Sequence, residues 1–246
     1  MTWRDRLTQA GFNTALPDLP KRLICSLDGN PKTGKTHFAH TAPEPIFYFV
    51  FDRGGREGVA NQFPGKEIFE YVIQLPKYDP KTPAAQLKTD FEHLWEDFKL
   101  KMALSWGVGE GTVVLDTATE MYELIRLGRF GKLTQILPRD FGNLYAEMNS
   151  LLRDMAYETS MNAVYLHKMG DQYINDQRTG LRERKGYKEM EYLVQANLET
   201  VRVDSPQGPT FCIRVKDCRL KASVIGKVYT PPLASFGYVM SQVHTP

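Results

Sequence analysis

Eight residues near the N-terminus have the types and the spacing of a phosphate-binding loop. They read Gly29-Asn30-Pro31-Lys32-Thr33-Gly34-Lys35-Thr36, the pattern G-x-x-x-x-G-K-[ST]. In such a loop the backbone N–H groups surround phosphate oxygens, the Lys35 ammonium reaches the β- and γ-phosphates, and the Thr36 hydroxyl ligates Mg²⁺. The pattern therefore predicts that the chain binds a nucleoside triphosphate together with Mg²⁺.

The segments that flank this loop are the ones that must position it. The apolar run over residues 23–27 predicts a buried strand before the loop, and residues 37–40 predict the start of a helix after it. Backbone N–H groups and the dipole at a helix N-terminus attract anions. A surface turn rich in glycine and proline is the alternative interpretation. The strand and the helix favour phosphate binding.

Asp116 is the candidate for the second metal-binding position. It ends the apolar run Thr112-Val113-Val114-Leu115, so it is expected at the carboxyl end of a buried strand. A carboxylate there would hold Mg²⁺ beside Thr36, because Mg²⁺ is usually bound by one or two protein groups and otherwise keeps its waters. The alternative is that Asp116 and Thr117 cap the following helix.

Hydrolysis also requires a group that orients or deprotonates the attacking water. Asp52 and Glu57 are candidates because they follow the apolar strand predicted over residues 46–51. His167 follows another predicted strand, residues 162–166, and is a candidate to contact the γ-phosphate or the water. A histidine at a strand end with no chemical role is the alternative for His167.

The alternation of strands and helices up to residue 167 predicts an α/β fold with a mainly parallel sheet flanked by helices. Helices are expected over residues 84–104 and 144–159, and residues 168–188 form a polar segment expected to be a loop. The last third of the chain predicts antiparallel strands. We expect one domain over residues 21–246 after an N-terminal lead, residues 1–20.

Composition narrows the class of protein. The chain has 246 residues, 42% of them hydrophobic and 24% charged, with a formal net charge of +2, which suits a globular domain with a sizeable core. The three cysteines form no C-x-x-C pair and predict reduced thiols. No apolar stretch approaches the roughly 20 residues needed to cross a bilayer. These features predict a cytoplasmic protein with no membrane partner.

The order of these motifs resembles the RecA-like core ATPases of phages, a family that includes relatives of RecA and RadA acting as single-strand annealing proteins. The resemblance covers residues 20–230 and depends on the loop at residues 29–36 and on strands ending at Asp52, Asp116 and His167. It implies a RecA-like P-loop NTPase core over residues 21–246, ATP as the nucleotide, and a homo-oligomer, either a ring or a filament. For a phage-encoded protein it implies the host cell cytoplasm.

The resemblance also implies roles for later residues. Residues 170–188 would match the second DNA-binding loop of RecA-like proteins, and residues 127–142 the first. Arg219 and Lys221 would reach the ATP of a neighbouring subunit. One departure concerns hydrolysis, because RecA-like proteins usually place a catalytic glutamate about two residues past the aspartate that stands here as Asp52. The next glutamate is Glu57, so Glu57 or Asp52 substitutes, or ATP acts mainly as a binding switch.

The segment from 168 to 188 has a composition suited to single-stranded DNA. Basic residues can follow the phosphates while aromatic rings stack on bases, and the candidates for these two roles are Arg178, Arg182, Arg184, Lys185 and Tyr187. An ordinary solvated loop is the alternative. Phe12-Asn13-Thr14-Ala15 matches the F-x-x-A pattern by which RadA-type proteins dock onto a neighbour, and packing onto its own core is the alternative there.

The sequence thus predicts an Mg-ATP-dependent, DNA-binding ATPase of RecA-like type, acting in phage recombination by annealing single-stranded DNA. A DNA-packaging or helicase motor is one alternative, although no translocation or nuclease module is visible in the sequence. Two others remain open from the residues alone. One is a P-loop kinase of a small molecule or nucleotide, with the basic residues of the 178–185 segment closing over both substrates. The other is an assembly protein that binds ATP as a switch and hydrolyses it negligibly.

Overall fold

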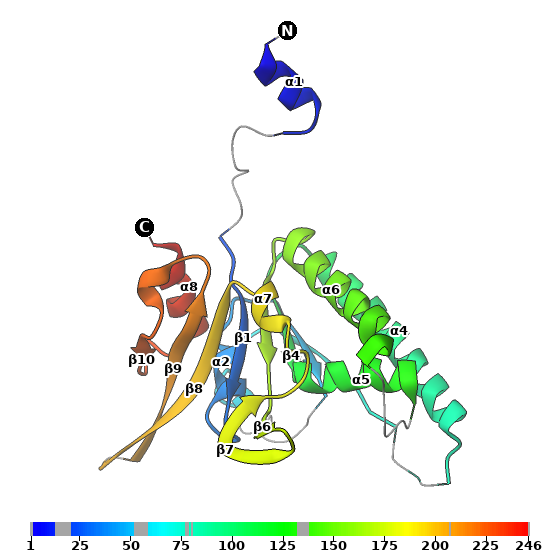
Figure 1. Ribbon diagram of the computed structural model, residues 1–246. Helices are drawn as coiled ribbons and strands as arrows, with labels where there is room; N and C mark the ends of the chain where they lie inside the picture. The colour runs from blue at the N-terminus through cyan, green and yellow to red at the C-terminus, as the bar shows by residue number, and fades with distance from the viewer. Residues whose placement is uncertain are drawn as a thin grey trace.

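A central twisted sheet organises the chain (Figure 1). The computed structural model describes residues 2–12, 21–51, 59–76, 79, 81–131, 138–206 and 208–245. Within these residues the strands form one sheet in the order β10-β9-β8-β1-β5-β4-β2-β3 and a separate hairpin, β6-β7. The strands are β1 (Ile24–Gly29), β2 (Ile46–Val50), β3 (Ile68–Val72), β4 (Thr112–Asp116), β5 (Asn162–Leu166), β6 (Met169–Ile174), β7 (Gln177–Arg184), β8 (Ala196–Ser205), β9 (Gly208–Cys218) and β10 (Val228–Tyr229).

The sheet is parallel from β8 to β3, and β9 and β10 add antiparallel pairs at one edge. Strand β1 lies between β5 and β8, and β5 separates it from β4. The carboxyl ends of β1, β5 and β4 therefore meet at one edge of the sheet. The predicted α/β class is confirmed, with a mainly parallel sheet, flanking helices and antiparallel strands near the C-terminus.

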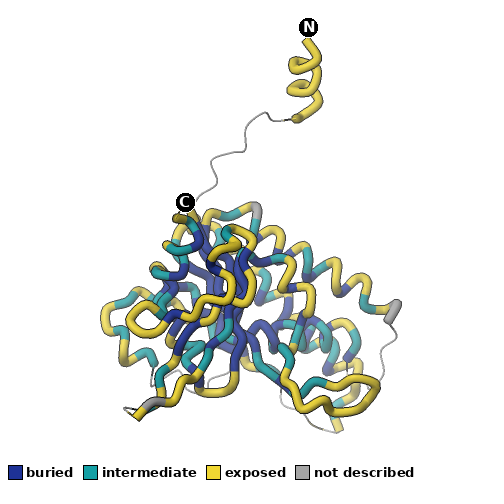
Figure 2. The backbone as a smooth tube through the Cα atoms, turned by 60° about the vertical axis from the view of Figure 1, so that its left-hand side comes forward, coloured by how far each residue is buried: buried dark blue, intermediate teal, exposed yellow. Residues whose placement is uncertain are grey.

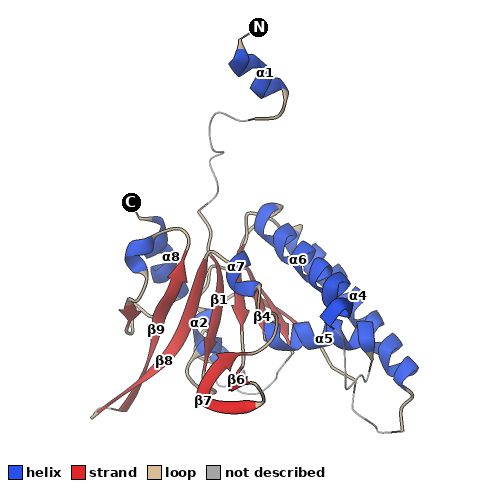
Figure 3. Ribbon diagram, viewed as in Figure 1, coloured by secondary structure: helices blue, strands red, loops and turns tan. Residues whose placement is uncertain are grey.

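Helices cover both faces of the sheet (Figure 3). The helices are α1 (Trp3–Gln9), α2 (Lys35–His40), α4 (Ala84–Trp106), α5 (Ala118–Phe130), α6 (Gly142–Tyr157), α7 (Met190–Leu193) and α8 (Phe236–His244), with short 3-10 turns η1 (Pro138–Phe141) and η2 (Ala222–Val224). Helices α4, α5 and α6 pack on one face, and α2 and α8 pack on the other. None of the described helices is long and apolar enough to cross a membrane.

The core consists of two apolar layers separated by the sheet (Figure 2). In β4, for example, Val113 and Leu115 belong to the layer under α4–α6, whereas Val114 belongs to the layer under α2 and α8. A strand that is buried on both faces needs a continuous apolar run, which is what its sequence supplies. Helix α1 has no buried residue.

The segment predicted as a polar loop after residue 167 is instead the hairpin β6–β7, so this prediction was wrong. The two strands pair antiparallel, with Tyr173 opposite Arg178 and Ile174 opposite Gln177. Asn175 and Asp176 form the turn, both with positive φ, 51° and 60°. These are the angles of a two-residue turn that favours asparagine and aspartate, so the local sequence did carry a hairpin signal.

Candidate nucleotide-binding site

The loop of residues 29–36 connects the carboxyl end of β1 to α2. Gly29 has a φ of 147°, and a Cβ atom there would lie 2.0 Å from the Thr200 hydroxyl of β8. Gly34 has a φ of 92°, and a Cβ atom there would lie 3.3 Å from Cβ of Phe211 on β9. Both positions require glycine, because β8 and β9 pass directly against the loop.

Hydroxyl groups fix the shape of the loop. The Thr33 hydroxyl donates to the carbonyl of Asn30 at 2.7 Å and also contacts the Thr200 hydroxyl. Thr200 in turn donates to the carbonyl of Asp28 at 3.3 Å. Thr33, Thr200 and Asp28 are all buried. The loop is therefore held by β8 before any ligand binds, which reduces the entropy that binding must overcome.

Lys35 lies folded over this loop. Its ammonium donates to the carbonyls of Gly29 at 2.8 Å and Asn30 at 2.9 Å. Burial lowers the pKa of Lys35, the nearby cations Arg182 and Lys168 lower it further, and the carboxylates of Asp116 and Asp28 oppose the shift. Several positive charges thus gather around a loop of backbone donors, an arrangement that an anionic ligand would stabilise.

Thr36 and Asp116 converge at the end of this loop. The Thr36 hydroxyl lies 3.3 Å from Oδ2 of Asp116, although 80 residues separate them in the sequence. A hydroxyl and a carboxylate at one point suit Mg²⁺, which prefers oxygen ligands and takes few of them from the protein. Thr36 and Asp116 are the residues that would hold the ion. Thr117 also caps α5, accepting a hydrogen bond from the N–H of Glu120. The capping alternative therefore holds for Thr117, while Asp116 lies beside Thr36.

Tyr48, which no sequence motif singles out, positions Asp116. Its buried hydroxyl donates to Oδ2 of Asp116 at 2.7 Å from the neighbouring strand β2. Its ring packs on His40, whose Nδ1 lies 2.8 Å from the carbonyl of Thr36. In sequence Tyr48 is one of several aromatic residues in an apolar run, so only the fold reveals its partner.

His167 lies at the carboxyl end of β5, between the P-loop strand and β4, and its N–H donates to the carbonyl of Leu27 at 2.9 Å. The side chain is completely buried, and within the described residues neither ring nitrogen has a hydrogen-bond partner by distance and angle. Burial, together with the positive charges of Arg184 and Lys216, holds the pKa of His167 well below its ordinary value. The imidazole is therefore neutral and closed off from solvent.

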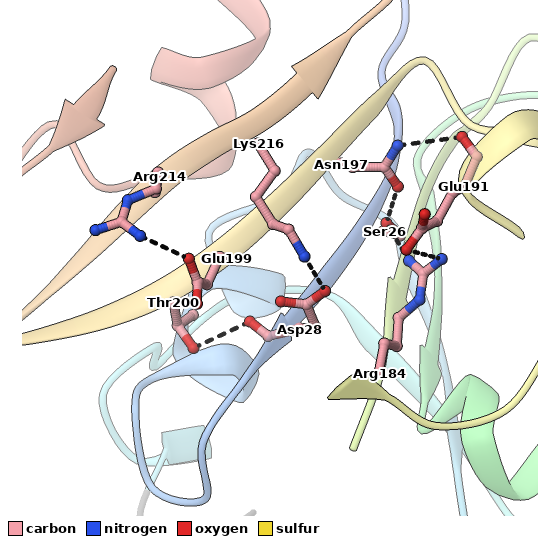
Figure 4. A network of polar contacts seen from close by, with 9 residues as sticks. All are labelled: Ser26, Asp28, Arg184, Glu191, Asn197, Glu199, Thr200, Arg214 and Lys216. Carbon is pink, nitrogen blue, oxygen red and sulfur yellow. Dashed lines mark hydrogen bonds and ion pairs between the residues drawn. The ribbon is translucent and has the colours of Figure 1, made fainter. Parts of the chain in front are cut away.

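A polar network connects side chains of β1, β7, β8 and β9 (Figure 4). The Arg184 guanidinium, from the end of β7, donates to the Ser26 hydroxyl at 2.9 Å and pairs with Glu191 at 2.9 Å. Ser26 donates to Asn197 of β8 at 2.6 Å. Next to them, the buried carboxylate of Asp28 pairs with Lys216 of β9 at 3.0 Å. Arg184 and Asp28 thus each have an opposite charge beside them, although Oδ1 of Asp28 has no hydrogen-bond partner among the described residues. The network joins β1, β7, β8 and β9.

The hairpin is attached to the site at its base. The Thr119 hydroxyl of α5 accepts from the N–H of Lys168 at 3.0 Å and donates to the carbonyl of Lys185 at 3.1 Å. Gly186, with a φ of 101°, passes so close to α5 that a Cβ atom would lie 3.1 Å from Cα of Thr119. The start of β6 and the end of β7 are thereby fixed to the helix that follows Asp116.

The hairpin residues predicted to bind DNA fall into separate environments. Arg178 is exposed and pairs with Asp171 at 2.8 Å, and Lys185 is exposed. The Arg184 side chain is 5% exposed within the network, and Arg182 contacts the phosphate-binding loop. Tyr187 is 2% exposed and stacks against Tyr122 and Tyr145. Arg184 and Tyr187 therefore present no surface to nucleic acid. Tyr173, which is 59% exposed, is the aromatic ring on the hairpin surface.

Arg219 and Lys221 lie at the opposite end of β1 from the phosphate-binding loop. The N–H of Arg219 donates to the carbonyl of Gln195, whose own N–H donates to the carbonyl of Ile24, the first residue of β1. The Arg219 guanidinium contacts the carbonyl of Tyr192, and the Lys221 ammonium donates to the carbonyl of Thr245 at 2.9 Å. Neither cation reaches the loop of its own chain.

Three of the remaining predictions concern residues outside the described ranges. Asp52 and Glu57, the candidates for activating water, belong to this group, as do residues 13–15 of the F-x-x-A pattern. Phe12 is described and is exposed.

Comparison with known proteins finds similarity among solved structures. No protein-family model matches the chain, and no curated protein matches it significantly. Among solved structures, the chain is similar to the crystal structure of a KaiC-like protein from the hyperthermophilic archaeon Pyrococcus horikoshii OT3. The sequences are 11% identical, the match covers 86% of this chain and 85% of that chain, and the TM-score is 0.44. The functional argument therefore comes from the geometry of the site.

Proposed function

We propose that the chain is a RecA-like ATPase that binds and hydrolyses Mg-ATP at the loop of residues 29–36. The observation that carries this proposal is the convergence of Lys35, Thr36 and Asp116, since Lys35 covers the loop and Thr36 lies 3.3 Å from Asp116. A phosphate loop alone fits many anions. The adjoining hydroxyl–carboxylate pair selects a triphosphate that arrives with its metal ion.

In the bound state, different residues would interact with different parts of the triphosphate. The backbone N–H groups of the loop donate to phosphate oxygens, and Lys35 exchanges its carbonyl partners for the β- and γ-phosphates. Mg²⁺ bound by Thr36 and Asp116 would neutralise charge that develops on the phosphates. Tyr48 keeps Asp116 turned toward Thr36 by donating to its carboxylate. These groups are positioned before binding, which is how phosphoryl transfer is mainly catalysed.

The test is nucleotide binding and turnover by the full chain. We expect saturable Mg-ATP binding and phosphate release, and we expect Lys35→Ala to lose both. Lys88→Ala is the matched control, because Lys88 is a surface lysine on α4 that pairs with Glu92 away from the site. Equal activity in Lys35→Ala and Lys88→Ala would contradict the proposal. Binding without turnover would favour the ATP-switch form, and turnover that requires a phosphate acceptor would favour a kinase.

We also propose that the hairpin β6–β7 is the surface that binds single-stranded DNA. Arg178, Lys185 and Tyr173 support this proposal, because an exposed cation and an exposed ring lie on the hairpin and a second exposed cation directly follows it. Cations that follow the backbone and rings that stack on bases bind single strands without sequence preference. The measurement is affinity for an oligonucleotide as a function of salt, where each phosphate contact contributes a slope of about 0.7.

Assembly into a ring or filament is the part of the proposal that concerns Arg219 and Lys221. These cations lie away from the loop of their own chain, so any contact with ATP requires a second copy. Mixing Lys35→Ala protein with Arg219→Ala protein tests this, since one interface of the mixed assembly would contain an intact loop and an intact cation. Recovered turnover would support the trans role, and unchanged inactivity would contradict it.

Annealing of single strands in phage recombination is the biological activity that the sequence resemblance implies, and we retain it as the proposed setting. The direct measurement is the rate at which two complementary oligonucleotides pair, with and without Mg-ATP. We expect the protein to accelerate pairing and Tyr173→Ala to reduce the acceleration. DNA-stimulated ATP turnover without any acceleration of pairing would point to a different DNA-dependent task.

A further inference from the structure

Arg182 is a hairpin residue whose side chain lies on the phosphate-binding loop. Its Nη1 donates to Oδ1 of Asn30 at 2.9 Å, and its Nη2 donates to the carbonyl of Met169 at 3.0 Å. Asn30 and Arg182 are 152 residues apart in the sequence. The second hydrogen bond holds the guanidinium against its own hairpin while the first directs it at the loop.

The contact is at the end of the loop where the terminal phosphate would lie. The carbonyl of Asn30, whose side chain Arg182 contacts, accepts a hydrogen bond from the Lys35 ammonium at 2.9 Å. Lys35 is the group that reaches the β- and γ-phosphates of a bound nucleotide. Arg182 is also close enough to Lys35 to lower its pKa. Both cations are thus placed at the β,γ end of the triphosphate.

Arg182 differs from its basic neighbours in the partners that it has. Arg178 pairs with Asp171, Arg184 with Glu191, and Lys168 with Glu120. Among the described residues, the hydrogen bonds of Arg182 go to an amide oxygen and a backbone carbonyl, and no carboxylate pairs with it. A guanidinium bound to neutral acceptors gains from exchanging one of them for a phosphate oxygen, because charge-assisted hydrogen bonds are shorter and stronger.

We propose that Arg182 binds the γ-phosphate of ATP within its own chain, so that the hairpin β6–β7 distinguishes ATP from ADP. This inference rests on the proposed nucleotide site. On ATP binding, Nη1 of Arg182 leaves Oδ1 of Asn30 and donates to a γ-phosphate oxygen. With ADP there is no γ-phosphate, and the contact with Asn30 remains.

The contacts at the base of the hairpin determine which part of it can change position when ATP binds. Thr119 holds Lys168 and Lys185 at its base, and Arg184 is fixed to Ser26. The portion beyond Arg184 carries Arg182 together with the exposed Tyr173 and Arg178. A change of partner at Arg182 is therefore transmitted to the surface proposed for DNA, while the base stays fixed.

The experiment compares the affinities for ADP and for the slowly hydrolysed analogue ATPγS by calorimetry in the presence of Mg²⁺. We expect Arg182→Ala to weaken ATPγS binding roughly 10- to 100-fold, the value of one hydrogen bond to a charged group. ADP binding should change less than about twofold. Arg182→Lys, which keeps the charge but loses the planar fork, should weaken ATPγS binding by an intermediate amount.

Arg153→Ala is the matched control, because it removes an exposed arginine on α6 that belongs to neither the loop nor the hairpin. It should leave both affinities unchanged. Arg182 is exposed, so the variants should melt at the temperature of the unmodified protein, and a circular dichroism melt verifies this.

A second readout follows the hairpin itself. Amide hydrogen exchange over residues 169–184 should slow when ATPγS binds but not when ADP binds, and Arg182→Ala should remove that difference. Equal losses of ATPγS and ADP affinity in Arg182→Ala, or no loss of either, would overturn the role of Arg182 and leave the nucleotide site intact. Failure of the unmodified protein to bind either nucleotide would overturn the site and this inference together.

Discussion

The end of β1 and the tip of the β6–β7 hairpin are the two regions proposed to bind phosphates, and they are built in opposite ways. At the end of β1, Asp28, Thr33 and Thr200 are buried and hold one another in place before any ligand arrives. At the hairpin tip, Tyr173 and Ile174 are exposed and the turn residues are solvated. A small ligand with fixed geometry is bound well by groups already in position. A flexible polymer requires an accessible surface.

Strand β7 connects these two regions. Arg178, Arg182 and Arg184 lie at successive positions along this strand, and a register shift in the hairpin separates Arg178 from the other two. Arg184, at the base, is buried in the polar network, whereas Arg182 reaches the loop and Arg178 faces solvent. The same residue type thus stabilises the fold, contacts the candidate nucleotide site, or remains available to a partner according to its distance from the sheet.

The largest effect on activity is expected at the phosphate-binding loop that follows β1. Asp116→Ala removes the carboxylate that would hold Mg²⁺ with Thr36, and ATP turnover should fall roughly 100-fold or more, because metal stabilisation contributes several kcal/mol. Steady-state phosphate release at saturating Mg-ATP is the measurement. Removal of Mg²⁺ with EDTA should abolish turnover in the unmodified protein.

Tyr48→Phe should lower ATP turnover less than Asp116→Ala does. It keeps the packing with His40 but removes the hydroxyl that donates to Asp116. We expect a loss of about tenfold or less, because the carboxylate remains and only its orientation is relaxed. Full activity in Asp116→Ala would show that Asp116 and the Tyr48 hydroxyl have only a structural role. The end of β1 would then no longer differ from the hairpin as a preformed binding site.

On the β6–β7 hairpin, the largest effect on DNA binding should come from Tyr173. Stacking of a base on an aromatic ring contributes about 1–3 kcal/mol, so Tyr173→Ala should weaken single-stranded DNA binding about tenfold. Fluorescence anisotropy of a labelled oligonucleotide measures it. Tyr192→Ala is the control, since Tyr192 is 72% exposed on α7 and not on the hairpin. Equal effects of the two substitutions would mean that any exposed ring suffices.

The arginines of β7 become more exposed from Arg184 to Arg178, which predicts that their substitutions have unequal effects on the free energy of unfolding. Arg184→Met removes the hydrogen bond to Ser26 and the ion pair with Glu191, and should lower the free energy of unfolding by about 1–2 kcal/mol. Arg178→Met breaks an exposed pair and should cost about 0.5 kcal/mol or less. Urea unfolding of both variants gives the comparison. Similar losses would show that depth in the sheet does not set the role of these arginines.

A further small effect concerns pH. In the folded protein, burial and the cations Arg184 and Lys216 keep His167 neutral because its pKa is well below the ordinary value. In the unfolded chain the same histidine takes up a proton near its ordinary pKa of about 6.5. The contribution of His167 to stability is therefore constant above that pH and decreases below it, by about 0.7 kcal/mol between pH 7 and pH 6.

His167→Asn tests this dependence, because asparagine does not titrate. Urea unfolding at pH 7 and pH 6 should show a smaller difference in the variant than in the unmodified protein. An unchanged difference would mean that other groups account for the acid sensitivity, and that His167 is accessible to protons in the folded state.

The sequence predicted the parts of the site that depend on local patterns. The residues from Gly29 to Thr36 are contiguous, and the strand before Asp116 is a buried apolar run, so their placement follows from short-range rules. The sheet is assembled from such runs, which explains why the α/β class was predicted correctly. The hairpin was not predicted although Asn175-Asp176 is a turn signal, because its strands are polar and carry no apolar alternation.

Other features depend on contacts between distant residues and could not be predicted. Tyr187 lies in a basic segment, but its burial is set by Tyr122 and Tyr145. Tyr48 looks like any core aromatic until β2 and β4 are adjacent and its hydroxyl reaches Asp116. Arg182 resembles Arg178 in sequence, and only the pairing register of the hairpin separates their roles.

The position of β1 has a consequence for the order in which the protein can be built. Both neighbours of β1 come from much later in the chain: the N–H of Leu23 bonds to Asn162, 139 residues on, and that of Ile24 bonds to Gln195, 171 residues on. Thr200 and Lys216, which secure the loop and Asp28, follow later still. A nascent chain therefore carries the complete phosphate-binding sequence long before it can have the site, and closing such distant contacts is the slow step of folding.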